Sequence, residues 1–300
     1  MVTKIDALNN AKKLLIEANI PDWQLSAEYI LAVALKCEHE DLYKIKSLND
    51  RQYKKYLKLL EERCDHVPLD KIVGYTEFYS LKIPYNRNVL TPRVETELLA
   101  DRLIRDIQDT IKKNKFPSPL SLLDLCTGSG CLGLSVAHNT NVNVTLSDIS
   151  RQAIKIAKAN NKYNNKLRVV DKKSSINPNF VMSDLFESID CKFDIIVCNP
   201  PYIKTEELNN LEIEVRDFDP ILALDGGKDG LDFYRKIIKS APNYLTCENG
   251  LGKIYFEIGV GQSEAIVKLL EKNFEEIEVI KDYSGIDRFI IAKKVNRDVK

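Results

Sequence analysis

The chain has 300 residues, of which 44% are apolar, enough to form the core of one large or two modest domains. Its 44 basic and 44 acidic residues balance, whereas a protein that holds a nucleic-acid backbone usually carries a basic excess, so we expect no direct nucleic-acid partner. No apolar stretch approaches 18 residues and the N-terminus lacks a signal-peptide pattern, which predicts a cytoplasmic protein without a membrane partner.

The cysteines are odd in number and contain no C-x-x-C pair. Seven are present, at positions 37, 64, 126, 131, 191, 198 and 247. In a cytosolic protein this pattern predicts free reduced thiols, with neither a disulfide framework nor a zinc site. We therefore expect no metal.

Apolar residues at helical spacing predict three helices within the first 65 residues. Thr3 with Asp6 resembles a capping box before the first helix, Pro21-Asp22 opens the second, and Asn49-Asp50 precedes the third. No chemical constellation is evident in them, so a helical bundle that packs on itself accounts for their apolar residues. We assign residues 1–80 to a helical N-terminal domain, and its role in positioning a substrate is a hypothesis.

Residues 81–118 are predicted to connect this domain to the next one. Strand-like pieces span Thr76 to Ile83, Pro92-Arg93 forms a break, and Glu95-Thr96-Glu97 starts a helix that Pro117 and Pro119 end. The remaining residues, 119–300, are predicted to form the second domain.

That domain opens with an apolar strand at 122–126, followed by Thr127-Gly128-Ser129-Gly130. The two glycines permit a sharp turn and the close approach of a ligand, and the helix that follows offers N–H groups. Asp148 stands twenty residues after Gly128, at the end of a second strand at 142–147. A carboxylate there can accept both hydroxyls of a ribose.

Gly128, Gly130 and Gly133 also fit the dinucleotide pattern G-x-G-x-x-G, which is weak by itself. In that pattern the first glycine follows its strand almost directly. Here Asp124 lies within the strand and two residues intervene, an arrangement that resembles class I S-adenosylmethionine-dependent methyltransferases. The sequence offers no hydride-transfer site, so a methyl donor is favoured over a nicotinamide.

A helix is expected next, at 150–160. A loose polar segment follows it, and residues 160–166 are expected to be solvated surface. A third strand at 180–182 ends near Asp184, which either accepts from the amino group of an adenine or caps a turn. A long, little structured stretch at 204–230 could cover the site as a lid. A strand at 253–258, a helix at 263–274 and a hairpin at 276–292 complete the chain. The expected fold is α/β and Rossmann-like, with a seven-stranded, mostly parallel sheet.

The motif Asn199-Pro200-Pro201-Tyr202 follows the apolar run 193–197, which is typical of a buried parallel strand. Ligands of open α/β sheets bind at such carboxyl ends. The prolines lack N–H groups, so the backbone presents only carbonyl acceptors, and the Asn199 side-chain oxygen adds another. Two acceptors could converge on one NH2 group, and Tyr202 could lie against a planar carboxamide or nucleobase. A plain Asn-Pro turn is the alternative.

Together these features resemble the HemK-type family of peptide chain release factor N5-glutamine methyltransferases. The shared stretches are Gly74-x-x-Glu77-Phe78, 90–97, 126–130, 199–202, 219–231 and Phe256-Glu257-Ile258-Gly259. Asn-Pro-Pro-Tyr also occurs in adenine-N6 DNA methyltransferases, so its combination with Pro92-Arg93 and the helical domain is the specific signal.

The resemblance implies transfer of a methyl group from S-adenosyl-L-methionine to the glutamine nitrogen in the Gly-Gly-Gln loop of class 1 release factors, by a monomer. The methionine portion of the donor would lie on Cys126, Thr127, Gly128, Ser129 and Gly130. Asp148 would hold the ribose, and Asp184 with Leu185 the adenine. The substrate would bind Asn199, Pro200, Pro201 and Tyr202, with Asn199 also beside the donor.

Four residues depart from the family pattern. Thr91 and Val94 replace an Ile and a Pro, Leu185 stands where an aromatic residue is common, and Cys126 replaces a small Gly or Ala. Three alternatives remain: glutamine methylation of a ribosomal protein, adenine-N6 methylation of DNA, and an inactive adaptor that binds S-adenosylmethionine.

Overall fold

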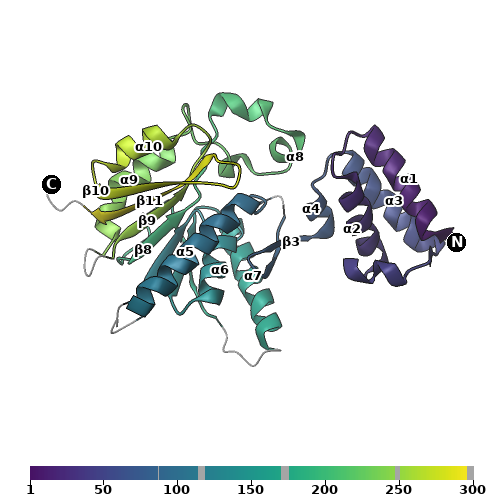
Figure 1. Cartoon of the computed structure of the whole chain (residues 1–300), viewed down its shortest axis with the longest axis horizontal. Coiled ribbons are helices and arrows are strands. Elements are labelled where there is room, and N and C mark those ends of the chain that lie inside the picture. Colours follow the sequence, from purple (N-terminus) through teal and green to yellow (C-terminus); the bar gives the residue numbers. More distant parts are fainter. Residues whose placement is uncertain (87, 114–118, 170–175, 247–250, 296–300) are drawn as a thin grey trace. The chain divides into compact units, whose positions relative to one another are not determined.

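The computed structural model describes residues 1–86, 88–113, 119–169, 176–246 and 251–295 (Figure 1). It divides into a helical unit, residues 1–76 with 212–218, and a second unit, residues 77–211 with 219–300. Among the described residues, no helix is long and apolar enough to cross a membrane. The expected thiol of Cys247 and the expected helix stop at Pro117 fall outside the described residues.

The helical unit is built from the three predicted helices. They are α1 (Lys4–Glu17), α2 (Trp23–Leu35) and α3 (Asp50–Cys64), joined by the 3-10 helix η1 (His39–Lys44), the short α4 (Leu69–Val73) and the strand pair β1 (Val2–Thr3) and β2 (Ser47–Leu48). The predicted start of α1 is confirmed, because the Thr3 side chain accepts from the Asp6 N–H at 3.1 Å. Asn49 and Gln52 form a reciprocal capping box at α3, with both bonds at 2.9 Å.

A distant segment, residues 212–218 with the short α8 (Ile213–Arg216), belongs to this same unit. Arg63 of α3 has only 2% of its side chain exposed and donates to Glu214 at 2.7 Å and to Asp22 at 2.8 Å. A buried guanidinium needs such partners because an unpaired charge is costly to desolvate. The sequence analysis did not predict this association.

The second unit contains a sheet that, in the described residues, has seven strands. Their order is β10 (Phe274–Lys281), β11 (Asp287–Val295), β9 (Lys253–Glu257), β8 (Ile195–Cys198), β5 (Ser121–Leu125), β6 (Asn143–Asp148) and β7 (Asn179–Met182). Strand β11 is antiparallel to both its neighbours, and the other pairs are parallel. The predicted seven-stranded, mostly parallel sheet is confirmed.

Helices cover both faces of this sheet (Figure 1). One face packs on α5 (Val94–Lys113), α6 (Cys131–Asn139) and α7 (Arg151–Val169), the other on α9 (Asp232–Tyr244) and α10 (Ser263–Leu270). Because side chains alternate along a strand, Val197 of β8 lies in the first core and Cys198 in the second. Such strands are apolar on both sides, which explains their continuous hydrophobic runs.

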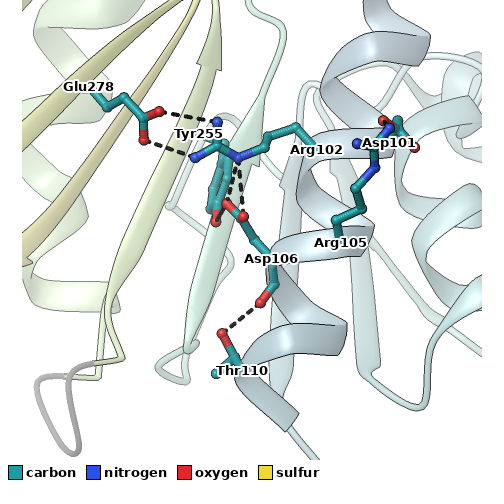
Figure 2. A network of polar contacts seen from close by, with 7 residues as sticks. All are labelled: Asp101, Arg102, Arg105, Asp106, Thr110, Tyr255 and Glu278. Atoms are coloured by element: carbon teal, nitrogen blue, oxygen red, sulfur yellow. Dashed lines mark hydrogen bonds and ion pairs between the residues drawn. The ribbon is translucent and has the colours of Figure 1, made fainter. Parts of the chain in front are cut away.

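Helix α5 is tied to the sheet by the polar network in Figure 2. Arg102 donates through both Nη atoms to Glu278 of β10, at 3.1 and 2.9 Å, and through Nε to Asp106. The Tyr255 hydroxyl of β9 donates to the same Asp106 at 3.0 Å. Two-pronged contacts of this kind are geometrically specific, so they hold the middle of α5 in one orientation over the sheet.

Three expectations for the elements are wrong. Helix α7 continues from Arg151 to Val169, beyond the expected end at 160. Residues 204–230 are not little structured, since they contain η2 (Thr205–Asn210), α8 and η3 (Ile221–Ala223). Helix α9 had no counterpart in the sequence analysis, and α10 ends at Leu270, before the expected 274.

The strand-like pieces near 76–83 form the hairpin β3 (Tyr75–Phe78) and β4 (Leu81–Pro84).

Candidate active site

A pocket lies at the carboxyl ends of β5, β6, β7 and β8, where the sequence placed the ligand. Its lining includes seven of the predicted site residues, namely Cys126, Gly128, Asp148, Asp184, Leu185, Asn199 and Pro201. A smaller adjoining pocket is lined by Thr127 and Ser129 and shares Cys126, Gly128 and Asn199 with the first. The two pockets thus bring predicted residues of four strand ends together, whereas the predicted residues Gly130, Pro200 and Tyr202 line neither of them.

The glycine loop after β5 is held in a left-handed conformation at three positions. Gly128 has φ 55° and Gly130 has φ 82°, values that glycine adopts without steric cost. Cys126 adopts φ 58° although it has a side chain, which costs about 1 kcal/mol or more. This explains why glycine suits position 126, and the cysteine is accommodated there under strain.

Asp124 of β5 stabilises the glycine loop by accepting two hydrogen bonds. It is 1% exposed, and its Oδ2 accepts from the Thr127 hydroxyl and from the Gly133 N–H, the latter at 3.0 Å. Burial raises its pKa to about 7, although both hydrogen bonds favour the carboxylate. A Cβ on Gly133 would lie 2.7 Å from this Oδ2, so glycine is needed for the close packing of α6 on β5.

Asp148 is placed to serve a ligand with hydroxyl groups. Its Oδ2 accepts from the Gly128 N–H at 2.9 Å and its Oδ1 from the Ser150 N–H at 2.8 Å. Each oxygen keeps a further acceptor position, and burial raises the pKa of the carboxyl. The neighbouring Ser147 lines the pocket, and its buried hydroxyl has no hydrogen-bond partner within the described structure.

The third strand end turns sharply through Asp184. The Glu187 N–H donates to the Asp184 carbonyl at 3.0 Å, and Leu185 has φ 47°. Ser183 fixes this turn, because its hydroxyl donates to the Leu185 carbonyl at 2.8 Å and accepts from the Ser188 N–H at 2.9 Å. Asp184 therefore opens a turn through its backbone carbonyl and lines the pocket, whereas contact of its carboxylate with an adenine stays a prediction.

Two buried asparagines of α7 correct part of the interpretation of 160–166 as solvated surface, whereas Lys162, Tyr163 and Lys166 are exposed as expected. Asn160 is 1% exposed and donates to the Ser129 carbonyl at 2.8 Å. Asn164 is 2% exposed and donates to the Lys82 carbonyl at 2.8 Å. A short amide side chain on a buried helix face can thus donate to the backbone carbonyls of the segments that pack on it, here the glycine loop and β4.

The Asn199-Pro200-Pro201-Tyr202 motif follows β8 directly. Asn199 is half-buried and lines both pockets, whereas Pro200 and Pro201 are buried. The Tyr202 carbonyl accepts from Gln262 Nε2 at 2.9 Å, and burial raises the pKa of its phenol, which therefore stays neutral. Convergence of the Asn199 and Pro200 oxygens on one NH2 group stays a prediction.

The motif is braced by the segment that follows it. Ile203 pairs with 224–226, through its N–H to the Leu224 carbonyl at 2.9 Å and its carbonyl to the Gly226 N–H at 2.7 Å. A Cβ on Gly226 would lie 2.7 Å from the Tyr202 Cα. Only glycine permits this approach, which explains Gly226, and Gly227 follows with a left-handed φ of 88° that glycine adopts without steric cost.

Thr96 and Glu257 were quoted as parts of motifs, but the sequence analysis gave them no role. Phe256 of β9 lies on the α9 side, so the next residue, Glu257, turns back toward α5. Thr96, in the first turn of α5, donates to Glu257 Oε2 at 2.7 Å and accepts from Asn199 Nδ2 at 3.5 Å. Cys198 and Phe256 are paired in the adjacent parallel strands β8 and β9, so the next residues, Asn199 and Glu257, also lie side by side. Knowledge of the strand order would have predicted this neighbourhood.

The Pro92-Arg93 segment also acquires a structural explanation. Arg93 donates to Asp219 Oδ2 at 3.1 Å, and the Thr91 hydroxyl donates to Asp219 Oδ1 at 3.0 Å. Asp219 immediately precedes Pro220, which lines the pocket together with Leu222. Residues 91–93 thus hold one wall of the pocket in place. Thr91, where an Ile was expected, contributes a hydrogen bond that an Ile cannot make.

S-adenosylmethionine fits the residues that are present. The Asp148 carboxylate has acceptor positions for ribose hydroxyls, and the unpartnered Ser147 hydroxyl in the pocket wall could bond a polar ligand atom. No atom lies within 4 Å of the place where a Gly128 Cβ would be, so the loop backbone is open to a ligand.

Comparison with known proteins points to one family. Residues 6–74 match the PrmC N-terminal domain, and residues 103–216 match the methyltransferase small domain. A release factor glutamine methyltransferase of Thermodesulfovibrio yellowstonii is 37% identical over 274 residues, which cover 89% of this chain and 91% of that protein. One from Fusobacterium nucleatum is 35% identical, covering 97% of this chain and 78% of that protein.

Among solved structures, the chain is similar to the hMettl16 catalytic domain in complex with a MAT2A 3′UTR hairpin. The TM-score is 0.53, with 18% identity over 90% of this chain and 92% of that one. At this identity the likeness concerns the fold alone, and it agrees with the α/β methyltransferase architecture described above.

Proposed function

We propose that this chain, which belongs to the release factor glutamine methyltransferase family and is therefore a methyltransferase, modifies the glutamine of the Gly-Gly-Gln motif in class 1 release factors. The methyl group of S-adenosyl-L-methionine would be transferred to the side-chain amide nitrogen. The proposed substrate places the reaction in the cytoplasm, and we expect the enzyme to act as a monomer.

One observation carries the proposal: Asn199 borders both the large pocket and the adjoining one at the end of a buried parallel strand. The large pocket supplies Asp148 and Gly128, whose chemistry suits the ribose of the donor. The Leu185 side would take the adenine, and the loop from Cys126 to Gly130 the methionine portion.

The residues of the motif suit a carboxamide substrate. The nitrogen of a carboxamide is a poor nucleophile because its lone pair is delocalised into the carbonyl group. Asn199 Oδ1 and the Pro200 carbonyl would accept its two protons, which orients the nitrogen and stabilises the positive charge that develops on it. Tyr202 would pack beside the carboxamide plane.

Bound S-adenosylmethionine supplies an activated methyl group on a sulfonium, so the chain need not provide a strong base. Tyr202 is unsuited to that role, since burial raises the pKa of its phenol. The chain contributes alignment and exclusion of water, which for well-placed reactants supply roughly 7 to 11 kcal/mol. The alkylated nitrogen can lose its proton after the transfer.

The test is mass analysis of an intact class 1 release factor after incubation with the enzyme and S-adenosylmethionine. We expect the addition of one methyl group, located on the Gly-Gly-Gln glutamine by fragmentation and absent when that glutamine is replaced by alanine. Asn199→Ala should slow the transfer roughly 100-fold. Asn209→Ala, an exposed asparagine of η2, is the control and should leave the rate unchanged.

Other acceptors belong in the same experiment. Methylation of DNA adenine, or of a ribosomal-protein glutamine with the release factor unmodified, would replace the proposed substrate. Donor binding without transfer to any acceptor would indicate an adaptor.

A further inference from the structure

Asn199, Thr96 and Glu257 form a short chain of hydrogen bonds behind the proposed substrate site. Asn199 Nδ2 donates to Thr96 Oγ1 at 3.5 Å, and Thr96 Oγ1 donates to Glu257 Oε2 at 2.7 Å. Thr96 is 4% exposed and Glu257 is 1% exposed. Contacts at catalytic residues are often long before substrate binds and tighten in the complex, so the 3.5 Å separation suits a positioning contact.

The direction of these bonds follows from counting protons. A threonine hydroxyl has a single proton, and an ionised carboxylate can only accept. Thr96 must therefore give its proton to ionised Glu257, and its lone pairs are left to face Asn199. Only the NH2 end of the Asn199 side chain can bond a lone pair, so the opposite end, Oδ1, points away from Thr96.

We propose that Thr96 and Glu257 are positioning residues, which hold the Asn199 carboxamide in the orientation that presents Oδ1 to the acceptor nitrogen. This inference rests on the proposed function. The two ends of an asparagine side chain have nearly the same shape, so packing alone discriminates poorly between them. A reversed Asn199 would place its own NH2 group against the NH2 group of the substrate. Both groups are donors, so Asn199 could then bind neither of the substrate's amide protons.

The arrangement also predicts a dependence on pH. Burial raises the pKa of Glu257 to about 7, the Thr96 hydrogen bond and the nearby Arg288 and Arg93 lower it, and Glu95 raises it. Once protonated, Glu257 can donate to Thr96, which frees the threonine proton to bond Asn199 Oδ1 in the reversed orientation. The rate of transfer should therefore rise with pH through about 7.

The first experiment compares hydroxyl variants in single-turnover methylation of the release factor. Thr96→Val keeps the shape but removes the hydroxyl. We expect the rate constant of methyl transfer to fall about tenfold, as the loss of about one hydrogen bond predicts, with donor affinity unchanged. Thr96→Ser should recover most of the rate. Thr110→Val makes the same change on the same helix, where the hydroxyl bonds the Asp106 carbonyl, and should have no effect. A wild-type rate in Thr96→Val would contradict the proposal.

The second experiment separates positioning from simple packing. In Glu257→Gln the rise of kcat between pH 6 and 8 should be reduced or absent, because the group that selects the orientation no longer titrates. Asp124 has a pKa of about 7 as well and is retained in both proteins, so the difference between the two profiles reports on Glu257. Profiles of the same shape in both proteins would overturn the inference.

A third measurement does not require activity. In protein labelled with 15N-asparagine, the side-chain NH2 signal of Asn199, identified by its absence in Asn199→Ala, should shift with pH around 7. Thr96→Val should abolish that shift. If the wild-type enzyme methylates no release factor, the proposed function fails while this signal still tests the orientation. The same titration in both proteins would refute the positioning role.

Discussion

Asp148 is the residue on which donor affinity should depend most directly. Both of its oxygens already accept backbone N–H groups, from Gly128 and Ser150, and so fix the loop as well as facing the ligand. In Asp148→Asn an NH2 group would oppose one of these N–H groups. We expect the dissociation constant for S-adenosylmethionine to rise between about 10- and 100-fold, the range for bonds to a charged group.

Titration calorimetry measures this change. Asp109→Asn, an exposed position on α5, serves as the control and should leave the affinity unaltered. An unaltered affinity in Asp148→Asn would mean that the carboxylate only supports the loop.

Two buried acids should contribute stability that is lost as the pH rises, while the buried His138, whose pKa burial lowers, contributes with the opposite sign near pH 6. Asp124 and Glu257 each have a pKa raised by burial to about 7, against about 4 in an unfolded chain. Between pH 4 and 7 the folded protein keeps protons that the unfolded chain has released. Their contribution to the free energy of unfolding therefore decreases as pH rises through this window, and it is lost above about 7.

Urea unfolding at pH 5, 6, 7 and 8 tests the sign. Asp124→Asn retains a carbonyl acceptor for Thr127 and Gly133, so we expect it to flatten the dependence. The exposed Asp229 and the half-buried Glu276, whose pKa values ion pairs lower to about 2, titrate below the window and do not interfere. The same pH dependence in Asp124→Asn and in the wild type would show that Asp124 is ionised in the folded state, because His138 titrates alike in both proteins.

At the residue scale, sequence patterns located the strand-end residues but not the groups that hold them. Gly128, Asp148 and Asn199 were predictable because motifs at the carboxyl ends of parallel strands face one edge. Asn160 was misjudged, since asparagine is usually exposed and nothing local indicates a loop carbonyl beneath the helix. Thr96 and Glu257 lie 161 residues apart, and their contact depends on strand order and side-chain alternation together.

At the scale of elements, the junction of α6 and β5 depends on Gly133. A Cβ there would lie 2.7 Å from Asp124 Oδ2 and 3.0 Å from Leu146 Cγ, atoms of two central strands that cannot easily move. Gly133→Ala should gain about 1 kcal/mol of helix propensity, yet the clash and the weakened bond from its N–H should cost more. We expect a net loss of about 2 kcal/mol in the free energy of unfolding.

Chemical denaturation measures this loss. Gly285→Ala is the matched change, because no atom lies within 4 Å of its Cβ position and only its φ of 78° opposes the substitution, at a cost of about 1 kcal/mol. A Gly133→Ala protein at least as stable as the wild type would show that α6 can move away from the sheet.

The elements themselves were largely predictable where hydrophobic periodicity is strong. The strands of the parallel core are apolar on both faces, and their runs were found within one or two residues of the observed bounds. The continuation of α7 to Val169 was missed because its polar residues resemble a loop, although buried asparagines anchor it. The short helices within 204–230 were missed because one or two turns give too little periodicity to recognise.

At the scale of the whole molecule, the course of the chain was not predictable from local patterns. Residues 212–218 belong to the helical unit, whereas the residues on either side of them belong to the unit that carries the pocket. The segment is anchored by Arg63, 151 residues away from Glu214 in sequence. An arginine within an amphipathic helix is normally taken as part of its solvated face, so composition gives no warning of this contact.

Arg63→Ala should release this segment. The substitution removes bonds to Asp22, Glu214 and Ser26, and it leaves two carboxylates without their cation. Because about a third of each carboxylate side chain is exposed, water can compensate in part, and we expect a loss of about 2 to 3 kcal/mol in the stability of the helical unit. Hydrogen exchange should accelerate in residues 212–218 and at the end of α3. Arg51→Ala removes an exposed arginine of the same helix and should change neither the stability of the helical unit nor the exchange rates. Unchanged exchange in 212–218 would show that apolar contacts, rather than the arginine, keep the segment on the helical unit.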